Sequence, residues 1–312
     1  MIVLAITFTF SSLLPLGKAI DVEITTVVPL TQHGKVGEQV RIIGTINKTD
    51  GLYRIFFGNL IVNETYAIEN EVDAAFSVRK LPRGNYTVIL QDVDMNINAT
   101  TWFFIDTAFF IEAIEPTPPE QLQENGTIDI LVNVTGGEAN TIYSANVTVD
   151  VPFPANETYW TLKALPNTTD TGSASATVVY PNDFQGIKTP HTNYVGIYNA
   201  TFNSTTVATD TFFVGLTNCT EYHRFQNIGI KAAGYQPSEN VTITISYGGN
   251  VIHSEPNITA SDVGMIQANW TVPSNASMGT YTLNIASTSS PPTSKNPPDT
   301  QNFTVPGFDV TI

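Results

Sequence analysis

The segment AFSVRKLPRGNYTVILQDVDMNINATTWFFI, residues 75–105, decides the fold class of this chain. It contains an apolar run, a Pro, a turn, a strand led by Tyr86 and a closing run rich in Phe. In NYTVIL (85–90) side chains alternate in polarity, and a period of two is typical of a strand with one buried face. We therefore predict short β-strands joined by turns that contain Pro and Gly.

The same order of features recurs twice further along the chain. It recurs closely as ANWTVPSNASMGTYTLNIAS and DTQNFTV (268–287 and 299–305), and loosely as ATVVYPNDF, TNYVGIYN and ATDTFFV (176–184, 192–199 and 208–214). Tyr86, Tyr194 and Tyr281 lead the corresponding strands, 108 and 87 residues apart, so each repeat has the length of a domain. Such a tyrosine is either the tyrosine corner of immunoglobulin-like sandwiches or an amphipathic residue with a buried ring and a wet hydroxyl.

The strand pattern of the first repeat predicts the architecture. We expect its strands at 22–29, 38–46, 52–58, 60–63, 73–79, 85–91 and 100–106. Seven short strands separated by turn residues are typical of a Greek-key sandwich. No amphipathic helical pattern of ten or more residues follows the N-terminal segment. The chain is therefore predicted to be all-β, with tandem immunoglobulin-like (Greek-key) β-sandwich domains.

The N-terminus has the pattern of an export signal. Residues 2–16, IVLAITFTFSSLLPL, are mostly apolar, and Gly17-Lys18-Ala19 suits cleavage after Ala19. The alternative is an N-terminal membrane anchor, for which the run is short against the ~20 residues that a bilayer requires. No second long apolar run follows, so we predict an extracellular or cell-surface location and no membrane span in the mature chain. The expected organisation is a signal peptide (1–19), three sandwiches (20–106, 107–216 and 217–306) and a last segment (307–312) that is the first strand of a further unit or a free terminal strand.

Composition excludes several classes of function. The 312 residues include 13 Lys and Arg against 28 Asp and Glu, a formal charge of −15. This balance disfavours nucleic acid and polybasic membrane contacts, because both need clustered cations. A single cysteine, Cys219, excludes an intrachain disulfide framework. We interpret it as a semi-buried apolar residue, with an intermolecular disulfide as the alternative.

The strongest signal is an excess of N-glycosylation sequons. With 27 Asn, and Ser plus Thr making 60 of 312 residues, random placement would give about five Asn-x-Ser/Thr triplets with a non-Pro centre. The chain has seventeen, which predicts N-linked glycans as its covalent partners. The predicted sites are Asn47, Asn63, Asn85, Asn98, Asn125, Asn133, Asn146, Asn156, Asn167, Asn199, Asn203, Asn218, Asn240, Asn257, Asn269, Asn275 and Asn302.

Eight of these sequons have an apolar central residue, as in Asn85-Tyr86-Thr87 and Asn146-Val147-Thr148. Because side chains alternate along a strand, Asn and Thr would point to water while the central residue points to the core. Several sequons are therefore predicted to lie on strands rather than at loop tips. An Asn- and Thr-rich β surface would produce some sequons incidentally, but not this excess.

Motifs that carry chemistry are scarce. The four His are scattered, and neither a G-x-S-x-G nor a phosphate-binding glycine loop is present, so we predict no enzyme. A pair of carboxylates for glycoside hydrolysis would meet in space and not in sequence, which keeps a secreted hydrolase as the weakest alternative. Asp92, Asp94 and Asn96 place oxygen ligands at alternate positions and form a candidate calcium loop. The alternative is a solvated hairpin turn, and no other cofactor is predicted.

The three tryptophans divide into two groups. Trp102 and Trp270 lie among apolar neighbours in predicted strands, which favours core packing. Trp160, in NETYWTLK, is the best candidate for an exposed aromatic contact to a sugar.

Two further segments resemble one another and a known family. HGKVGEQVRIIGTI (33–46) and AAGYQPSENVTITI (232–245), each followed by a G-x-Y strand, resemble tandem immunoglobulin-like domains of archaeal secreted cell-surface proteins, including S-layer and adhesin-like glycoproteins. The resemblance covers the first and third repeats well and the second poorly, and its motifs are those of a fold. It implies a non-catalytic coat, S-layer component or adhesive stalk, whose partners are other surface glycoproteins or copies of itself. Alternatives are a carbohydrate- or protein-binding module and a filament subunit assembled by strand exchange.

Overall fold

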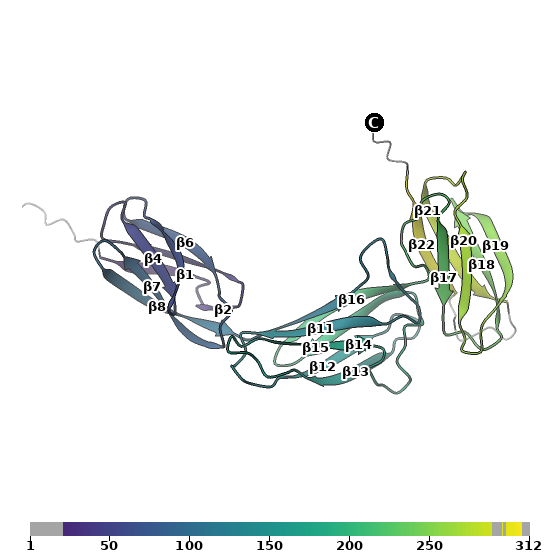
Figure 1. The fold of residues 1–312 in the computed structure, drawn as a ribbon, viewed down its shortest axis with the longest axis horizontal. Helices are drawn as coiled ribbons and strands as arrows, with labels where there is room; N and C mark the ends of the chain where they lie inside the picture. Colours follow the sequence, from purple (N-terminus) through teal and green to yellow (C-terminus); the bar gives the residue numbers. More distant parts are fainter. Residues whose placement is uncertain (1–20, 289–294, 296–297, 308–312) are drawn as a thin grey trace, which may run out of the picture. The chain divides into compact units, whose positions relative to one another are not determined.

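The structure is a computed structural model, which describes residues 21–288, 295 and 298–307. The predicted signal peptide (1–19) and residues 308–312 of the predicted terminal strand lie outside the described residues. The chain divides into two compact units, Met1–Asp106 and Thr107–Ile312, and the described part of each is all-β (Figure 1). No helix in the described ranges is long and apolar enough to cross a membrane.

The first unit is one sandwich of eight strands. They are β1 (Glu23–Val28), β2 (His33–Lys35), β3 (Gln39–Thr45), β4 (Leu52–Phe57), β5 (Leu60–Tyr66), β6 (Glu71–Ser77), β7 (Gly84–Asp92) and β8 (Ile97–Asp106). One sheet has the order β1-β3-β6 and the other β2-β8-β7-β4-β5. Residues such as Ile42, Ile55 and Phe103 fill the space between them with no exposed surface. Each such side chain contributes about 1.5–3 kcal/mol by its burial.

One strand of this sandwich was absent from the sequence prediction. The three residues His33–Lys35 form β2, which pairs in parallel with β8. So short a segment has no readable alternation, and its extended form depends on hydrogen bonds to a strand far along the chain. His33 therefore lies in a strand, and its ring centroid lies 4.9 Å from that of Phe104.

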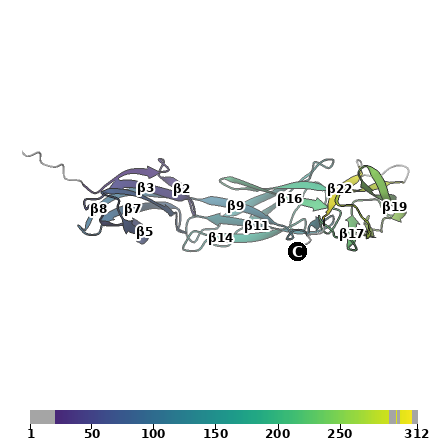
Figure 2. The ribbon, with the colours of Figure 1, turned by 90° about the horizontal axis from the view of Figure 1, so that it is seen from above.

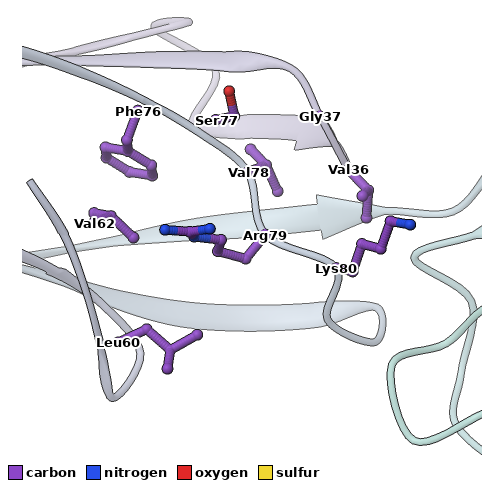
Figure 3. Close-up of a pocket in the computed structure, with 9 residues that line it drawn as sticks. All are labelled: Val36, Gly37, Leu60, Val62, Phe76, Ser77, Val78, Arg79 and Lys80. Carbon is purple, nitrogen blue, oxygen red and sulfur yellow. The ribbon is translucent and has the colours of Figure 1, made fainter.

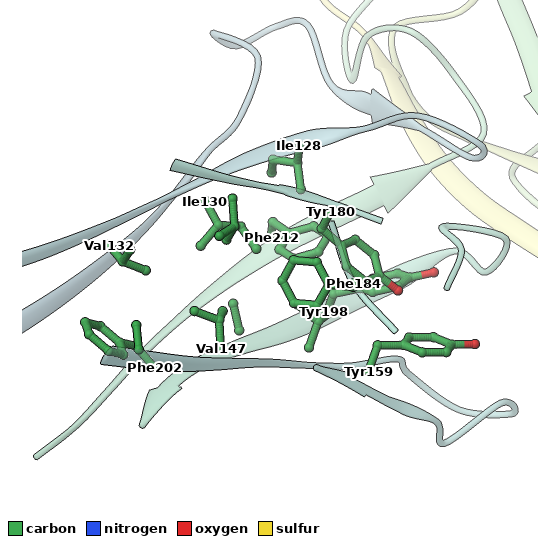
Figure 4. Packing of buried hydrophobic residues seen from close by; sticks show 14 of the residues in the cluster. Ile128, Ile130, Val132, Val147, Tyr159, Tyr180, Phe184, Tyr198, Phe202 and Phe212 are labelled. Atoms are coloured by element: carbon green, nitrogen blue, oxygen red, sulfur yellow. The ribbon is translucent and has the colours of Figure 1, made fainter. Parts of the chain in front are cut away.

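The second sandwich repeats the arrangement of the first. Its strands are β9 (Ala108–Ile114), β10 (Leu122–Gln123), β11 (Ile128–Thr135), β12 (Ser144–Asp150), β13 (Thr158–Ala164), β14 (Ala174–Tyr180), β15 (Gly196–Asn203) and β16 (Val207–Gly215). They form the sheets β14-β11-β9, visible in Figure 2, and β10-β16-β15-β12-β13. The short β10 pairs in parallel with β16, as β2 does with β8. Ile130, Val147, Tyr198 and Phe212 point into the core between the sheets (Figure 4).

The third sandwich lacks a full first strand. It consists of β17 (Asn227–Ala232), β18 (Asn240–Tyr247), β19 (Asn250–Thr259), β20 (Ile266–Thr271), β21 (Gly279–Ser287) and β22 (Asp299–Val305), in the sheets β17-β20 and β19-β18-β21-β22. The place of the first strand is taken by isolated bridges, antiparallel from Thr217 to Ile230 and parallel from Glu221 to Thr304. The second and third sandwiches have separate hydrophobic cores within one compact unit.

All three sandwiches have a tyrosine corner. In each, a strand begins with Gly-x-Tyr and the tyrosine hydroxyl donates to the carbonyl oxygen four residues earlier. The pairs are Tyr86 with Pro82 (2.9 Å), Tyr198 with Tyr194 (3.2 Å) and Tyr281 with Ser277 (2.7 Å). This feature and the sheet orders identify tandem immunoglobulin-like sandwiches.

The assignment of Tyr194 to this role was wrong. Tyr194 precedes β15 and supplies the carbonyl that accepts, whereas Tyr198 supplies the hydroxyl. The strand starts at Gly196, whose φ of 145° favours glycine, and a Cβ there would lie 3.1 Å from Pro152. The sequence offers two tyrosines four residues apart, and only the start of the strand decides between them.

Candidate functional site

None of the seventeen sequon asparagines is buried. Twelve are exposed and five are half-buried, the latter being Asn47, Asn63, Asn133, Asn199 and Asn203. Every one of these asparagine residues is therefore at least partly open to solvent. The occupancy of the sites by glycans stays a prediction.

The sequons with apolar centres follow the alternation expected of strands. Seven of the eight lie in strands, and Asn218 is the exception. Five central residues are buried, namely Val134, Val147, Val241, Trp270 and Phe303, and the other three, Tyr86, Cys219 and Ile258, are half-buried. A strand can thus present Asn and Thr to water and contribute to the core between them.

Asn218 differs from the other sequon asparagines by its hydrogen bonds. Its Oδ1 accepts the Tyr222 hydroxyl at 2.8 Å and the Gly229 N–H at 3.1 Å. This carboxamide therefore holds the short segment that replaces the first strand of the third sandwich. The adjacent Cys219 is half-buried against the third core, and burial and the nearby Glu120 raise the pKa of its thiol.

Two of the three tryptophans lie as the sequence predicted, and Trp102 does not. Trp270 is buried, as expected, and Trp160 is 39% exposed. Trp102 was expected in a core but is 46% exposed, because it lies on the outer face of β8 while Phe103 points inward. The apolar neighbours Phe103 and Ile105 supply the inward positions, and one step along a strand reverses the face.

A cavity of about 400 Å³ lies beside Trp160. It is lined by Asn156, Glu157, Thr158, Tyr159, Trp160 and Lys188, with Ile187. The Glu157 carboxylate accepts hydrogen bonds from Lys188 and from the Tyr159 hydroxyl. Burial acts to raise the pKa of Glu157, but the hydrogen bonds from Lys188 and Tyr159 outweigh it and lower that pKa. The cavity combines an aromatic surface with a charged pair, a composition that suits polar ligands such as sugars.

A groove of about 620 Å³ lies between β5 and β6, the edge strands of the two sheets of the first sandwich (Figure 3). Its apolar lining includes Leu60, Val62, Phe76 and Val78. Arg79 and Lys80 add positive charge at one side. An unpaired edge beside an apolar floor is the arrangement that accepts an added strand.

The most buried polar cluster lies between the second and third sandwiches. We call Glu124, Tyr235, Lys295 and Asp299 the junction cluster. The Lys295 Nζ lies 2.8 Å from both Glu124 carboxylate oxygens and 2.6 Å from Asp299 Oδ2, which also accepts the Tyr235 hydroxyl at 2.6 Å. Glu124 further accepts the Ala233 N–H at 2.7 Å. Glu124 follows β10 of the second sandwich, and the other members belong to the third.

Burial shifts the pKa values of the two carboxyl groups in the junction cluster. Side-chain exposure is 0% for Glu124, 1% for Lys295 and 5% for Asp299. Burial raises the pKa of Glu124 well above its usual value, and raises that of Asp299, although the Lys295 ammonium opposes both shifts. Both shifts follow from the removal of two carboxyl groups from water at one place.

Glutamine side chains extend this junction. Gln123 Nε2 donates to the carbonyl oxygens of Leu216 and Gly229, at 2.9 and 3.0 Å. Gln301 Oε1 accepts the backbone N–H groups of Leu216 and Thr217. Because these bonds join residues far apart in the sequence, no motif indicated them. The sequence predicted the boundary at 216/217 but gave no sign of the contacts that join the two sandwiches there.

The three predicted calcium ligands have different surroundings in the structure. Asp92 is buried, and its carboxylate accepts the N–H groups of Asn47, Lys48 and Met95 at 3.0–3.1 Å. Asp94 lies on the surface, 3.7 Å from the Lys48 ammonium. Among the described residues, no group of three or more His, Cys, Asp or Glu is placed to hold a metal. Asn96 adopts a left-handed turn with a φ of 55°, and calcium binding stays a prediction.

Comparison with known proteins finds likenesses of fold alone. No family model matches the chain, and no curated protein does. Among solved structures, a tetra-tandem repeat from the extending region of a large adhesion protein is 16% identical with a TM-score of 0.25, covering 91% of this chain and 73% of that one. The titin I-band fragment I67–I69 is 10% identical with a TM-score of 0.22, covering 88% and 95%. The BSP domain of a biofilm-associated protein is 8% identical with a TM-score of 0.20, covering 88% and 80%.

Proposed function

We propose that this chain is an exported, N-glycosylated, non-catalytic structural protein of the cell surface, used as a coat component or adhesive stalk. The observation that carries the proposal is the placement of its seventeen sequons, none of which has a buried asparagine. Sugars on the outer faces of the strands would leave the packing of the sandwiches undisturbed. Together with the charge of −15, they would keep the surface hydrated.

The junction cluster supports a structural role. Opening the contact between the second and third sandwiches would expose or unpair Glu124 and Lys295, which are fully desolvated where they meet. Removing one partner of a buried ion pair costs about 3–5 kcal/mol, so bending at this junction is disfavoured. A pair of sandwiches held in this way acts as a stiff spacer, which is what a stalk or a coat requires.

Glycopeptide mass spectrometry of the protein from its native source tests the proposal. We expect glycans at most of the seventeen sequons, and the intact protein in the cell-envelope fraction. A chain without any N-linked glycan, or one confined to the cytosol, would contradict the proposal.

A filament subunit is the second candidate, favoured by the groove between β5 and β6. The segment GFDVTI (307–312) alternates apolar and polar residues, and its Asp309 is complementary in charge to Arg79 and Lys80. Insertion of this segment into the groove of a second copy would add a strand at the unpaired edge. Deleting 307–312 should then abolish polymers seen by electron microscopy while leaving a folded monomer. Unchanged polymers, or their absence from the intact protein, would exclude strand exchange through this segment.

A further inference from the structure

Both exposed tryptophans have the same relation to a sequon on the neighbouring strand. Trp102 on β8 lies directly opposite Thr87 on β7, the threonine of the Asn85 sequon. Trp160 on β13 lies directly opposite Thr148 on β12, the threonine of the Asn146 sequon. In each case the sequon asparagine pairs with the residue two positions after the tryptophan, so asparagine and tryptophan are diagonal neighbours. Diagonal neighbours on one face have Cα atoms about 7–8 Å apart, within reach of large side chains.

A second sequon precedes each tryptophan in the chain by four residues. Asn98 and Thr100 precede Trp102 by four and two residues, and all three are exposed on the same face of β8. Asn156 and Thr158 precede Trp160 with the same spacing, and all three line the cavity of about 400 Å³. Each exposed indole therefore has one sequon on the adjacent strand and another that precedes it in the chain, on β8 itself for Asn98 and in the turn before β13 for Asn156. The buried Trp270, by contrast, is the central residue of a sequon and packs in the third core.

This repetition is not inherited from the domain repeat. In the first sandwich the tryptophan lies on β8, which is flanked by β2 and β7. In the second it lies on β13, an edge strand that pairs with β12. These are different positions in the same fold, so the arrangement has arisen at two unrelated places. A common role for a tryptophan placed beside sequons would explain why the arrangement occurs on both β8 and β13.

Contacts within the chain fix the Trp102 ring and the Trp160 backbone before any ligand arrives. The indole of Trp102 meets the His33 ring edge-on, with 5.8 Å between centroids. Around Trp160, the backbone N–H and C=O exchange hydrogen bonds of 2.9 Å with Gln185, so this edge residue is bonded on both sides. A fixed aromatic face loses little conformational entropy when a ligand stacks on it.

We propose that Trp102 and Trp160 are stacking platforms for the inner sugars of the N-linked glycans carried by the sequons beside them. This inference rests on the proposed function, because it requires those sequons to be occupied. A pyranose ring has one face of C–H groups, and laying that face on an indole removes apolar area of both from water. The glycan is thereby held along the strand instead of extending freely. The nearer sources are Asn85 and Asn146 on the adjacent strands, and the other sources are Asn98 and Asn156, four residues before each tryptophan.

A double-mutant cycle in the glycosylated full-length chain tests this at Trp160. We expect Trp160→Ala to raise the unfolding equilibrium constant about fivefold more in the parent chain than in a chain that carries Asn146→Gln or Asn156→Gln. The asparagine that shows the coupling is the source of the stacked sugar. The Trp102 cycle uses Asn85→Gln and Asn98→Gln in the same way. Additive effects in all four cycles would overturn the proposal.

Matched controls separate stacking from general effects of the substitutions. Val251→Ala changes an exposed apolar residue whose strand partner, Ser246, belongs to no sequon. Asn302→Gln removes an exposed sequon on β22, opposite Thr282 rather than a tryptophan. Val251→Ala should be additive with the four Asn→Gln variants, and Asn302→Gln should be additive with Trp102→Ala and with Trp160→Ala. Coupling as large as that of the tryptophans would show that the glycans act through the surface in general.

Acrylamide quenching provides a readout that does not depend on unfolding. Enzymatic removal of the glycans from the wild-type chain should increase quenching, because the two exposed indoles lose their cover while the buried Trp270 is unaffected. The same removal in a Trp102→Phe/Trp160→Phe chain should leave quenching unchanged. Equal quenching of the wild-type chain before and after glycan removal would overturn the proposal.

Glycopeptide mapping distinguishes failure of this inference from failure of the proposed function. If Asn85, Asn98, Asn146 and Asn156 are unoccupied while other sequons carry glycans, the stacking platforms are excluded and the structural glycoprotein stands. If no sequon is occupied, both are excluded. Occupancy at a flanking asparagine of each tryptophan, with coupling in its cycle, supports both.

Discussion

The ammonium of Lys295 lies 2.8 Å from both carboxylate oxygens of Glu124, although 171 positions separate the two residues and they belong to different sandwiches. Asp299 and Tyr235 complete the set on the side of the third sandwich. A charged cluster at a domain junction, closed to solvent, specifies one arrangement of its two partners, because any other arrangement leaves a charge desolvated and unpaired.

Lys295→Met should reduce the stability of the second and third sandwiches by about 3–5 kcal/mol, because it leaves two buried carboxyls without their cation. Urea unfolding can be followed by Trp270 fluorescence in a Trp102→Phe/Trp160→Phe background. The control is Lys188→Met, which removes the 71% exposed partner of Glu157 and should leave the transition unchanged. Equal effects of the two variants would show that burial of the ion pair contributes nothing.

The raised pKa of Glu124 fixes the sign of a pH effect. Below the pKa of a carboxyl in the unfolded chain, ~4.3, Glu124 is protonated in both states and carries no penalty. Above it the unfolded state releases the proton first, so the contribution of Glu124 to stability falls as the pH rises through the folded-state pKa. We therefore compare the unfolding free energy of the wild type with that of Glu124→Gln at two pH values. The difference, wild type minus variant, should be larger at pH 4.5 than at pH 8, by at most about 1.4 kcal/mol for each unit by which the pKa of Glu124 differs between the folded and unfolded states. A difference that does not vary with pH would contradict this account.

Tyr198→Phe should destabilise the second sandwich by about 1–2 kcal/mol, because it leaves the Tyr194 carbonyl without its donor and its N–H without its acceptor. Tyr194→Phe keeps those backbone groups paired and should change stability by less than about 0.5 kcal/mol. Thermal unfolding of the two variants measures the difference. A larger loss of stability in Tyr194→Phe than in Tyr198→Phe would show that Tyr194 is the corner residue.

Asp92→Ala should cost on the order of 3 kcal/mol, because three backbone N–H groups lose a buried acceptor. A different variant, Asp94→Ala, tests the calcium loop. If Asp92, Asp94 and Asn96 bind calcium, millimolar calcium raises the unfolding temperature of the wild type and not that of Asp94→Ala. No change in the wild-type midpoint removes the calcium hypothesis.

Local patterns predicted much of the fold and of the sequon surface. In β12 and β18 the alternation of residues such as Val147 and Val241 with polar neighbours assigned both the strand and its buried face. The same alternation predicted that sequon asparagines such as Asn146 would be open to solvent. It failed at Trp102, because apolar residues are consecutive there and the pattern no longer distinguishes the two faces.

The sequence by itself determined the all-β class, the repeats and the water-facing side of regularly alternating strands such as β12 and β18, because these follow from the two-residue period of an extended chain. Only the tertiary structure decided that β2 and β10 exist, that Tyr198 forms the corner and that Lys295 meets Glu124. Those contacts join residues far apart along the chain, and their energy arises from pairing and desolvation that occur only once the sheets have assembled. A lysine in a Pro-rich segment carries no local sign of the carboxylates that it will contact.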